Sequence, residues 1–381
     1  MRPGLPALLL ALTAAAALAA DPPKSEEEKP ETPSEAPVPV PLTPPPPPAP
    51  APAPKVNLVP SLSGFIQVQF TAGLDNTGEG VSSTATVFIR RGRIRVKGNV
   101  AQGIGYTFLA DLATVNNLLR DAYVSTTLVP NHEIRLGQQK TQFGYENPEA
   151  ATEVFFINFA YASEALARGP DLRDLGVGVL GQWELPAGFG VDYQLTAVNG
   201  AGPNVLVDDT PRKNLWGRAG GSYGDFGWKL KVGVSGTTGD RLFKADPVTM
   251  QPAYKVLFTR LGVDVRADTL WFFAAAEGAL GTNDPSTGTG ATTAAGGYVM
   301  AIGKTSWNVG PLVRAEFYDP DLAAVGDRLQ RFTLGAYVDL KSEELCGQLK
   351  AGAIRLLINL DLDASETRRD HAVLSWVQAA F

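Results

Sequence analysis

The sequence predicts an all-β protein, a transmembrane antiparallel β-barrel of about sixteen strands with one helical loop folded inward. Three observations carry this prediction: an export signal at the N-terminus, alternating apolar and polar residues through residues 56–381, and a last strand that ends at Phe381. The last strand of an open sheet leaves a free edge, whereas a closed barrel pairs its last strand with its first.

The first twenty residues are typical of a secretory signal peptide. Arg2 supplies a positive charge, residues 5–18 are almost wholly apolar, and Ala17 and Ala19 precede Asp21 in the A-x-A spacing of a cleavage site. The apolar run is shorter than the roughly 20 residues that span a bilayer, which argues against a membrane anchor. We therefore assign residues 1–20 to a cleaved signal peptide.

Residues 21–55 are charged and rich in proline, and they include an unbroken run of prolines over residues 44–48. Proline fixes φ and removes hydrogen-bond donors, so this composition favours a disordered, extended periplasmic linker. Two roles stay open for it, a plain spacer or a tether that touches the cell wall. Residues 56–381 are assigned to the barrel.

Period-two alternation runs through the body of the chain. In one run Ile66, Val68 and Phe70 face away from Gln67 and Gln69, as expected for a strand with one apolar and one polar face. Each run has roughly the 9–11 residues, or slightly more, that a tilted strand needs to cross a bilayer. The predicted strands lie near 62–74, 85–99, 103–113, 117–128, 132–141, 174–185, 188–198, 213–223, 226–236, 254–267, 269–281, 294–304, 306–318, 329–341, 346–362 and 370–381.

A soluble secreted β-sandwich or β-propeller would alternate as well. Here, however, the polar faces repeatedly carry charged side chains, which a dry core does not tolerate unpaired. A water-filled lumen tolerates them. Short turn signals alternate with the longer polar links 75–83, 239–252 and 282–293, the pattern of periplasmic turns and extracellular loops in membrane barrels.

The composition argues against several other functions. A formal net charge of −6 gives no support to nucleic-acid binding. Cys346 is the one cysteine, so no internal disulfide forms, and His132 and His371 are the two histidines. So few ligands and bases argue against a zinc site or a histidine-based catalytic triad. We expect no enzyme activity, no cofactor and no metal.

One long segment, residues 143–174, breaks the alternation. It begins with helix-start signals, Asn147 as a cap, Pro148 at the first helical position, and Glu149 and Glu153 in the first turns. Apolar residues follow over 154–161. A loop of this length in a compact fold is usually functional. We expect it to fold into the lumen and narrow it, with an external cap as the alternative.

Several motifs resemble the phosphate-selective porin O and P family. The run Arg135-Leu-Gly-Gln-Gln-Lys-Thr-Gln-Phe-Gly-Tyr-Glu146 matches that family's R-x-G-Q-x-K-x-x-F-G-x-E, and Arg173-Asp-Leu-Gly-Val177 matches R-D-x-G-V. The basic second strand, residues 88–98, and the Val198-Asn-Gly-Ala-Gly202 turn agree as well. The resemblance implies a sixteen-stranded, homotrimeric barrel in the outer membrane of a Gram-negative bacterium. It also implies that the long loop forms the constriction, with the candidate residues Glu146, Glu149, Glu153, Arg168, Arg173 and Asp174.

The C-terminal strand resembles that of outer-membrane barrels, which ends in Phe and is read by the barrel-insertion machinery. Phe381 is therefore the candidate insertion signal.

The second strand carries a ladder of positive charge, since Arg91, Arg93, Arg95 and Lys97 share one face at period two. In a lumen such a ladder attracts anions. Asp111 and Asp121 on the next two strands share the inward parity and could neutralise part of it. The predicted pore-lining basic residues are Arg91, Arg93, Arg95, Lys97, Arg135, Lys229 and Lys231.

The function expected from these features is passive diffusion of small hydrophilic solutes across the outer membrane, with outer-membrane lipid around the barrel. A preference for anions, phosphate among them, stays open. The alternative is a non-conducting structural barrel tethered to the cell wall by the proline-rich arm.

Overall fold

The computed structural model describes residues 58–74, 85–114, 118–167, 173–205, 212–225, 227–243, 252–288, 290–340, 354–365 and 370–381. The predicted signal peptide and linker lie outside these residues, as do Arg168, Cys346 and the link 75–83. Statements below concern the described residues.

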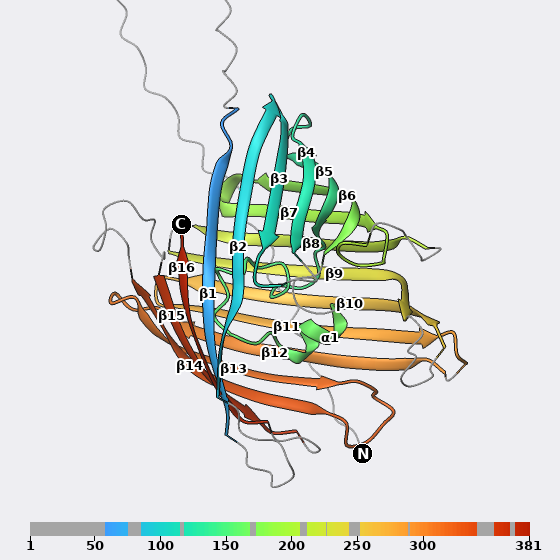
Figure 1. The fold of residues 1–381 in the computed structure, drawn as a ribbon, viewed down its shortest axis with the longest axis vertical. Coiled ribbons are helices and arrows are strands. Elements are labelled where there is room, and N and C mark those ends of the chain that lie inside the picture. Colours follow the sequence, from blue (N-terminus) through green and yellow to red (C-terminus); the bar gives the residue numbers. More distant parts are fainter. Residues whose placement is uncertain are drawn as a thin grey trace, which may run out of the picture. The chain divides into compact units, whose positions relative to one another are not determined.

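Sixteen antiparallel strands close into one barrel, in which each strand pairs with its neighbours in sequence and β1 pairs with β16 (Figure 1). The strands are β1 Ser61–Gly73, β2 Thr86–Ala101, β3 Ile104–Asp111, β4 Leu119–Thr126, β5 His132–Lys140, β6 Arg173–Glu184, β7 Phe189–Val198, β8 Asn214–Asp225, β9 Trp228–Phe243, β10 Tyr254–Thr269, β11 Phe272–Pro285, β12 Thr292–Gly303, β13 Val309–Asp319, β14 Leu329–Leu340, β15 Ile354–Asp363 and β16 Ala372–Ala380. Every predicted run overlaps one of them, which confirms the predicted fold class.

Two predicted loops are shorter than the sequence suggested. The first residues of the links expected at 239–252 and 282–293 belong to strands, because β9 continues to Phe243 and β11 to Pro285. Cross-strand packing extends the first ladder: the rings of Phe243 and Tyr254 stack with centroids 4.9 Å apart. The polar, glycine-rich sequence of these segments gives no local strand signal, and the strand ends form because pairing with a distant strand stabilises them.

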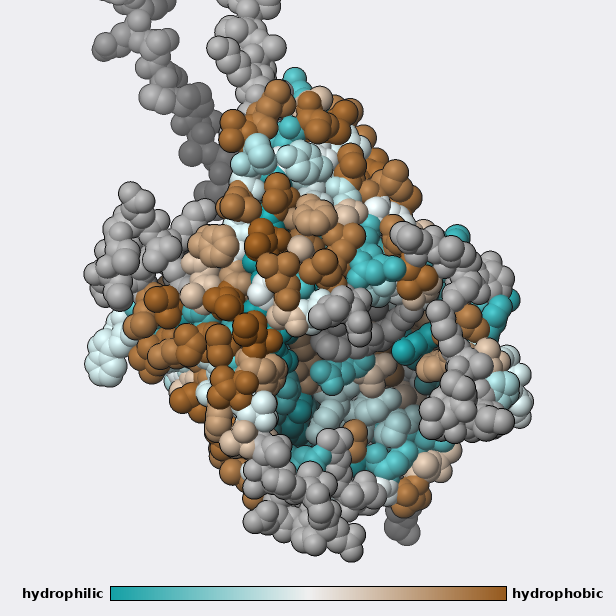
Figure 2. Space-filling model, viewed as in Figure 1, coloured by the Kyte–Doolittle hydropathy of each residue, from teal (hydrophilic) through white to brown (hydrophobic). Residues whose placement is uncertain are grey.

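The barrel is polar inside and apolar outside. On β1, Gln67 is fully buried, whereas its neighbour Ile66 is 42% exposed. On β9, Val232 and Val234 are exposed while Ser235 is buried. An apolar outer band suits lipid, and a polar interior suits water. Figure 2 shows hydrophilic residues gathered in the hollow of this face and hydrophobic ones on the strands around it.

The last residue closes the barrel. Phe381 N–H donates to the carbonyl of Gly64, and Gly64 N–H donates back to the carbonyl of Phe381, both at 2.9 Å. The Phe381 ring lies so close to Gly64 that a Cβ there would collide with it. Beyond this pair, β16 follows β1 in continuous register, for example Val377 opposite Val68.

The barrel has two rims. The terminal rim is where β1 begins and β16 ends, and the loop rim is where β1 ends and β2 begins. The connection from β5 to β6 starts at the loop rim and carries the helix α1, Tyr161–Leu166, which lies within the barrel in Figure 1. We call the described part of this connection, residues 141–167, the inner loop. No helix in the described ranges is long and apolar enough to cross a membrane.

The predicted helix start at Asn147 is wrong. Residues 146–153 form turns, with Glu149 N–H donating to the carbonyl of Glu146 and Glu153 N–H to that of Ala150. The helix starts later, at Tyr161. The reason is that wall side chains occupy the backbone carbonyls that a helix would use as acceptors: Lys140 donates to that of Glu149, Gln67 to that of Ala151 and Arg355 to that of Thr152.

Candidate functional site

The inner loop packs its apolar side chains against one side of the barrel interior. Phe156 and Ile157 are buried with Ala160 in one cluster. The wall side of this cluster comes from β11 to β16 and includes Ala275, Tyr298, Met300, Ile302, Leu312, Tyr337, Leu357, Leu374 and Trp376. Burying this much apolar surface fixes the loop inside the barrel. The inward fold predicted from the sequence is therefore confirmed.

The Phe-Gly-Tyr-Glu segment that follows β5 anchors the loop. The Glu277 carboxylate on β11 accepts the backbone N–H groups of Tyr145 at 2.8 Å and Glu146 at 3.1 Å, and the hydroxyl of Tyr298 at 3.0 Å. Gly144 has φ +69° and lies against Glu277, where any side chain would collide. This position therefore requires glycine, both for its backbone conformation and for the close approach.

Glu146 ties the loop to the opposite wall strands. One carboxylate oxygen accepts a hydrogen bond from Arg314 Nη1 at 2.8 Å, and the other accepts from the backbone N–H of Ala160, also at 2.8 Å. Arg314 also pairs with Glu316, which pairs in turn with Arg331. Glu146 thus serves as a structural clamp at the centre of a buried ion-pair network.

Loop aromatics lie on wall arginines. The guanidinium of Arg314 stacks over Phe156 at 4.6 Å, that of Arg331 over Tyr161 at 4.3 Å. Arg355 lies over Phe155 at 4.4 Å. Such contacts are favourable when desolvated, and they cover positive charge that would otherwise face the lumen. Basic residues on this side therefore hold the loop.

The predicted ladder on β2 splits into two halves. Arg91 donates to Gln67 Oε1 at 2.8 Å, and Arg93 pairs with Asp111 at 2.8 Å, both arginines being buried. Arg95 and Lys97 lie further toward the terminal rim, opposite Ser63 and Ser61 of β1, and are exposed. Neither has an ion pair within the described residues.

Substituting Arg93 tests this split. We expect Arg93→Gln to lower the stability of the folded barrel by about 3 kcal/mol, because it leaves the buried Asp111 carboxylate without its partner. The measurement is the temperature at which the compact form seen on unheated SDS gels converts to the unfolded form. Arg95→Gln, on the same strand and face, is the matched control and should leave that temperature unchanged. Equal shifts in the two variants would contradict the assignment.

A wide cavity of about 920 Å³ lies inside the barrel beside β5 to β9 and reaches the terminal rim. Its basic residues are Arg135, Arg218 and Lys231, and its acids are Glu133, Glu184 and Asp192. Arg135 pairs with Glu133 at 2.7 Å, and Arg218 pairs with Asp192 at 3.2 Å and with Asp264. Among the described residues Lys231 has no ion pair.

Lys229 shares the face of Lys231 on β9, since the two residues are two positions apart. It lies opposite Gly224 of β8 and Asp268 of β10, near the terminal rim, and is exposed. Asp268 itself pairs with Lys304. Lys229 therefore has no ion pair in the part of the chain that the structure describes.

Two residues predicted for the constriction belong to the wall instead. Arg173 begins β6 and pairs with Asp121 at 2.6 Å, so Asp121 does not neutralise the β2 ladder. Asp174 Oδ2 accepts the backbone N–H groups of Gly200 at 2.9 Å and Gly202 at 3.2 Å. These contacts join β6 to the turn after β7, so their role is structural.

Glu149 and Glu153 do belong to the inner loop. Glu149 lies 3.6 Å from Arg266, and Glu153 is exposed. Burial raises the pKa of Glu149 above its ordinary value, against the opposing charges of Arg266, Lys140 and Lys231. Burial likewise raises the pKa of Glu164 in α1. As pH falls, these carboxyl groups therefore lose their charge earlier than ordinary glutamates do.

Glu277 and the network around Arg314 are the functional residues that sequence reasoning missed. The sequence patterns assign no role to Glu277, Arg314, Glu316 or Arg331. Their partners lie more than a hundred residues away in the chain, at Tyr145, Glu146 and Phe159. The sequence feature that could have pointed to these residues is the concentration of charged, inward-facing side chains on strands that also carry inward-facing aromatic residues.

The comparisons with known proteins agree with this architecture. The family model described as phosphate-selective porin O and P matches residues 64–181, from β1 through the inner loop into β6. No curated protein sequence matches the chain.

Solved porin structures share the whole barrel. OmpT of Vibrio cholerae, in its trimer form, has a TM-score of 0.59 at 9% identity over 85% of this chain and 99% of that chain. The anion-selective porin from Comamonas acidovorans has a TM-score of 0.57 at 13% identity over 85% and 99%. The outer membrane channel DcaP of Acinetobacter baumannii has a TM-score of 0.55 at 13% identity over 84% and 97%.

At these identities the likenesses show the fold, and the family model adds the sequence relation that the motifs around Arg135 and Arg173 had indicated. The closed barrel, its apolar outer face and its polar interior agree with both. Residues 64–181 thus match the family model of phosphate-selective porin O and P, and the chain has the sixteen-stranded barrel fold of outer-membrane porins.

Proposed function

We propose that this porin passes small hydrophilic solutes with a preference for anions over cations. The observation that carries the proposal is a difference between the acidic and basic side chains of the lumen in how many form ion pairs. Lumen acids such as Asp111, Glu133 and Asp264 each contact an arginine. Four basic side chains on the open side of the lumen have no ion pair within the described residues, namely Arg95, Lys97, Lys229 and Lys231.

These charges follow the solute path toward the terminal rim. Arg95 and Lys97 are two positions apart on β2, as are Lys229 and Lys231 on β9, so both pairs point into the lumen. Exposed charges of one sign raise the local concentration of counter-ions. The description of the family as phosphate-selective, and of one barrel of the same fold as anion-selective, supports this direction of preference. The proposal extends to anions in general, phosphate among them.

Reversal potentials test the preference. The purified full-length protein, in a planar bilayer with a KCl gradient, should give discrete current steps and a permeability ratio of Cl⁻ to K⁺ above unity. A ratio at or below unity would overturn the anion preference and leave the porin intact. A folded barrel that conducts nothing would favour the alternative, a structural barrel tethered by the proline-rich arm.

We further propose a homotrimer surrounded by outer-membrane lipid. One structure of the same fold is described as a trimer form, and the apolar outer face offers surface to both lipid and neighbouring subunits. Native mass spectrometry of the detergent-solubilised barrel tests the assembly, and a monomeric mass would overturn it. The proposed cleavage after residue 20, which leaves residues 21–55 as a periplasmic linker, is tested by the mass of the mature chain.

Phe381 is proposed as the signal that the barrel-insertion machinery reads. We expect deletion of Phe381 to reduce the membrane level of the protein to a small fraction of wild type while export continues. The deletion removes two backbone hydrogen bonds to Gly64 at the seam of the barrel as well as the aromatic ring. Immunoblots of membrane and periplasmic fractions measure the effect. Phe381→Tyr, which keeps the ring and the hydrogen bonds, is the control, and wild-type membrane levels in the deletion would refute the proposal.

A further inference from the structure

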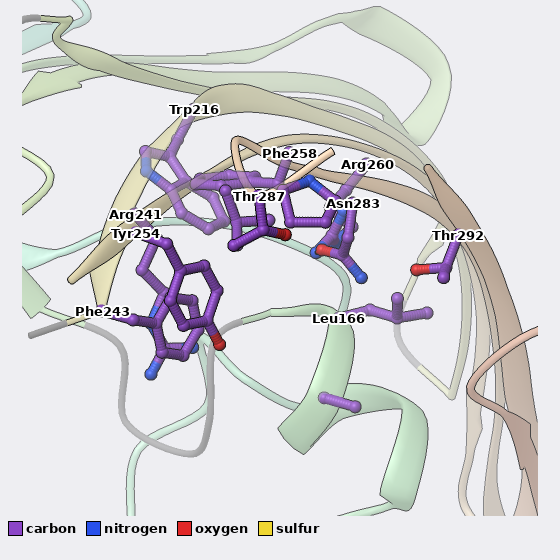
Figure 3. Close-up of a pocket in the computed structure, with 13 residues that line it drawn as sticks. Leu166, Trp216, Arg241, Phe243, Tyr254, Phe258, Arg260, Asn283, Thr287 and Thr292 are labelled. Atoms are coloured by element: carbon purple, nitrogen blue, oxygen red, sulfur yellow. The ribbon is translucent and has the colours of Figure 1, made fainter. Parts of the chain in front are cut away.

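A second cavity, of about 470 Å³, lies at the loop rim between α1 and strands β8 to β11 (Figure 3). Leu166 of α1 forms one wall, and side chains from the ends of β9 and β10 form another. The inner loop separates this cavity from the wide cavity at the terminal rim, whose lining residues are different. A solute that enters from the loop rim meets it before it passes the loop. A volume of this size is within the range that holds a small organic ligand.

Two arginines supply its charge. Arg241 and Arg260 both line the cavity, and none of the described residues that line it is acidic. Neither arginine has an ion pair within the described residues. In contrast, the buried arginines of the wall, such as Arg218, Arg314 and Arg355, each pair with a carboxylate.

Arg260 is the unusual member of the pair, because it is 93% buried and yet has no carboxylate partner. Its Nη1 donates to the carbonyls of Thr259 and Thr282, and its Nη2 to Oδ1 of Asn283. Its Nε is buried without any hydrogen-bond partner. A buried cation held only by neutral groups is unfavourable unless a counter-charge arrives. The anion that would supply this charge is therefore a ligand.

Aromatic rings form the rest of the cavity. Phe243 and Tyr254 stack at 4.9 Å with their planes 5° apart, and Phe258 lies 6.1 Å from Trp216. Each arginine stacks on one of these rings, Arg241 on Phe243 at 4.7 Å and Arg260 on Phe258 at 5.3 Å. Stacking holds a guanidinium by its face, so a carboxylate can take the N–H edge of Arg241 and the second N–H of Arg260 Nη2.

We infer that this cavity binds organic anions that combine a carboxylate with a flat apolar ring, that is, aromatic carboxylates. The arginine edges would take the carboxylate, and the rings would contact the apolar body. An inorganic anion would use the arginines alone and gain nothing from the four rings. The inference deepens the proposed anion preference by naming a class of solute. That aromatic carboxylates are transported rests on the proposed function, whereas their binding to the cavity can be measured whether or not the barrel conducts.

Calorimetry on the detergent-solubilised full-length protein tests the inference, with benzoate as the probe. Acetate carries the charge without the ring, benzyl alcohol carries the ring without the charge, and phosphate is an inorganic anion. We expect benzoate to bind at least about tenfold more tightly than any of these three, because charge and ring act together. Binding of phosphate or acetate as tight as that of benzoate would overturn the inference, and so would the absence of benzoate binding.

Variants locate the site. Arg241→Gln should weaken benzoate binding about tenfold, and Arg241 is exposed at the rim, so the fold does not depend on it. Tyr254→Leu should weaken benzoate and leave acetate unchanged. Lys304→Gln, at the opposite rim, is the matched control and should bind benzoate as wild type does. Unchanged binding in Arg241→Gln would place the site elsewhere. The Cl⁻ to K⁺ permeability ratio of the same preparations reports separately on the proposed function.

Discussion

Replacing residues 148–167 with a short Gly-Ser linker is expected to raise the single-channel conductance about two- to threefold, because the inner loop occupies part of the lumen cross-section. The loop packs α1 against β11, β12 and β13 and buries Phe156 and Ile157 against the wall. Removing it opens that side of the lumen to water. Bilayer recordings in 1 M KCl measure the change, and an unaltered conductance in a folded trimmed barrel would place the loop outside the solute path.

The trimmed barrel should also be less stable than wild type. Tyr298, Met300 and Ile302 lose the apolar side chains that cover them, and water then contacts their surface. Glu277→Ala separates this effect from steric blocking, since it keeps the loop at full length and removes the two hydrogen bonds by which Glu277 holds the loop backbone. We expect this variant to give frequent current fluctuations between two or more levels. Steady wild-type current would show that Glu277 does not hold the loop.

The strands could be predicted from the sequence because alternation is a local property. Each strand exposes apolar residues to the outside and polar ones to the lumen, so eight to ten residues suffice to recognise it, as at Ile66 and Gln67. Closure could be predicted as well, since Phe381 ends a strand that needs a partner. The prediction was least accurate at the strand ends, where pairing such as that of Phe243 with Tyr254 depends on a distant residue.

The inner loop shows why local signals fail inside a lumen. Asn147 and Pro148 are a sound helix start, yet side chains of the wall donate to the backbone carbonyls of Glu149, Ala151 and Thr152, which a helix would use as its own acceptors. Parity placed the arginines of β2 on the correct face but could not assign their partners. Asp111 pairs with Arg93, whereas Asp121 pairs with Arg173 at the start of β6. The strand register and the distance that each side chain can span decide which residues form ion pairs. A local sequence pattern predicts neither of them.

Neutralising the four unpaired basic residues of the lumen is expected to have the largest effect on selectivity. The substitutions Arg95→Gln, Lys97→Gln, Lys229→Gln and Lys231→Gln keep polar side chains and remove four positive charges that form no ion pair with a described acid. The permeability ratio of Cl⁻ to K⁺ should fall at least about twofold, because the local potential no longer concentrates anions. Reversal potentials across a KCl gradient give the ratio directly.

Two further measurements test whether the change in permeability ratio comes from the charge of these four residues: its dependence on salt concentration and its absence in a control variant. The difference between the fourfold variant and wild type should be large at 0.1 M salt and small at 1 M, since the Debye length shrinks from about 10 Å to about 3 Å. The control is Arg328→Gln: Arg328 pairs with Asp319 beyond the end of β13 at the loop rim, away from the four basic residues, so the charge beside them is unchanged. A ratio that stays constant in the fourfold variant, in a correctly assembled barrel, would remove these residues from the anion preference and direct attention to Arg241 and Arg260 at the opposite rim.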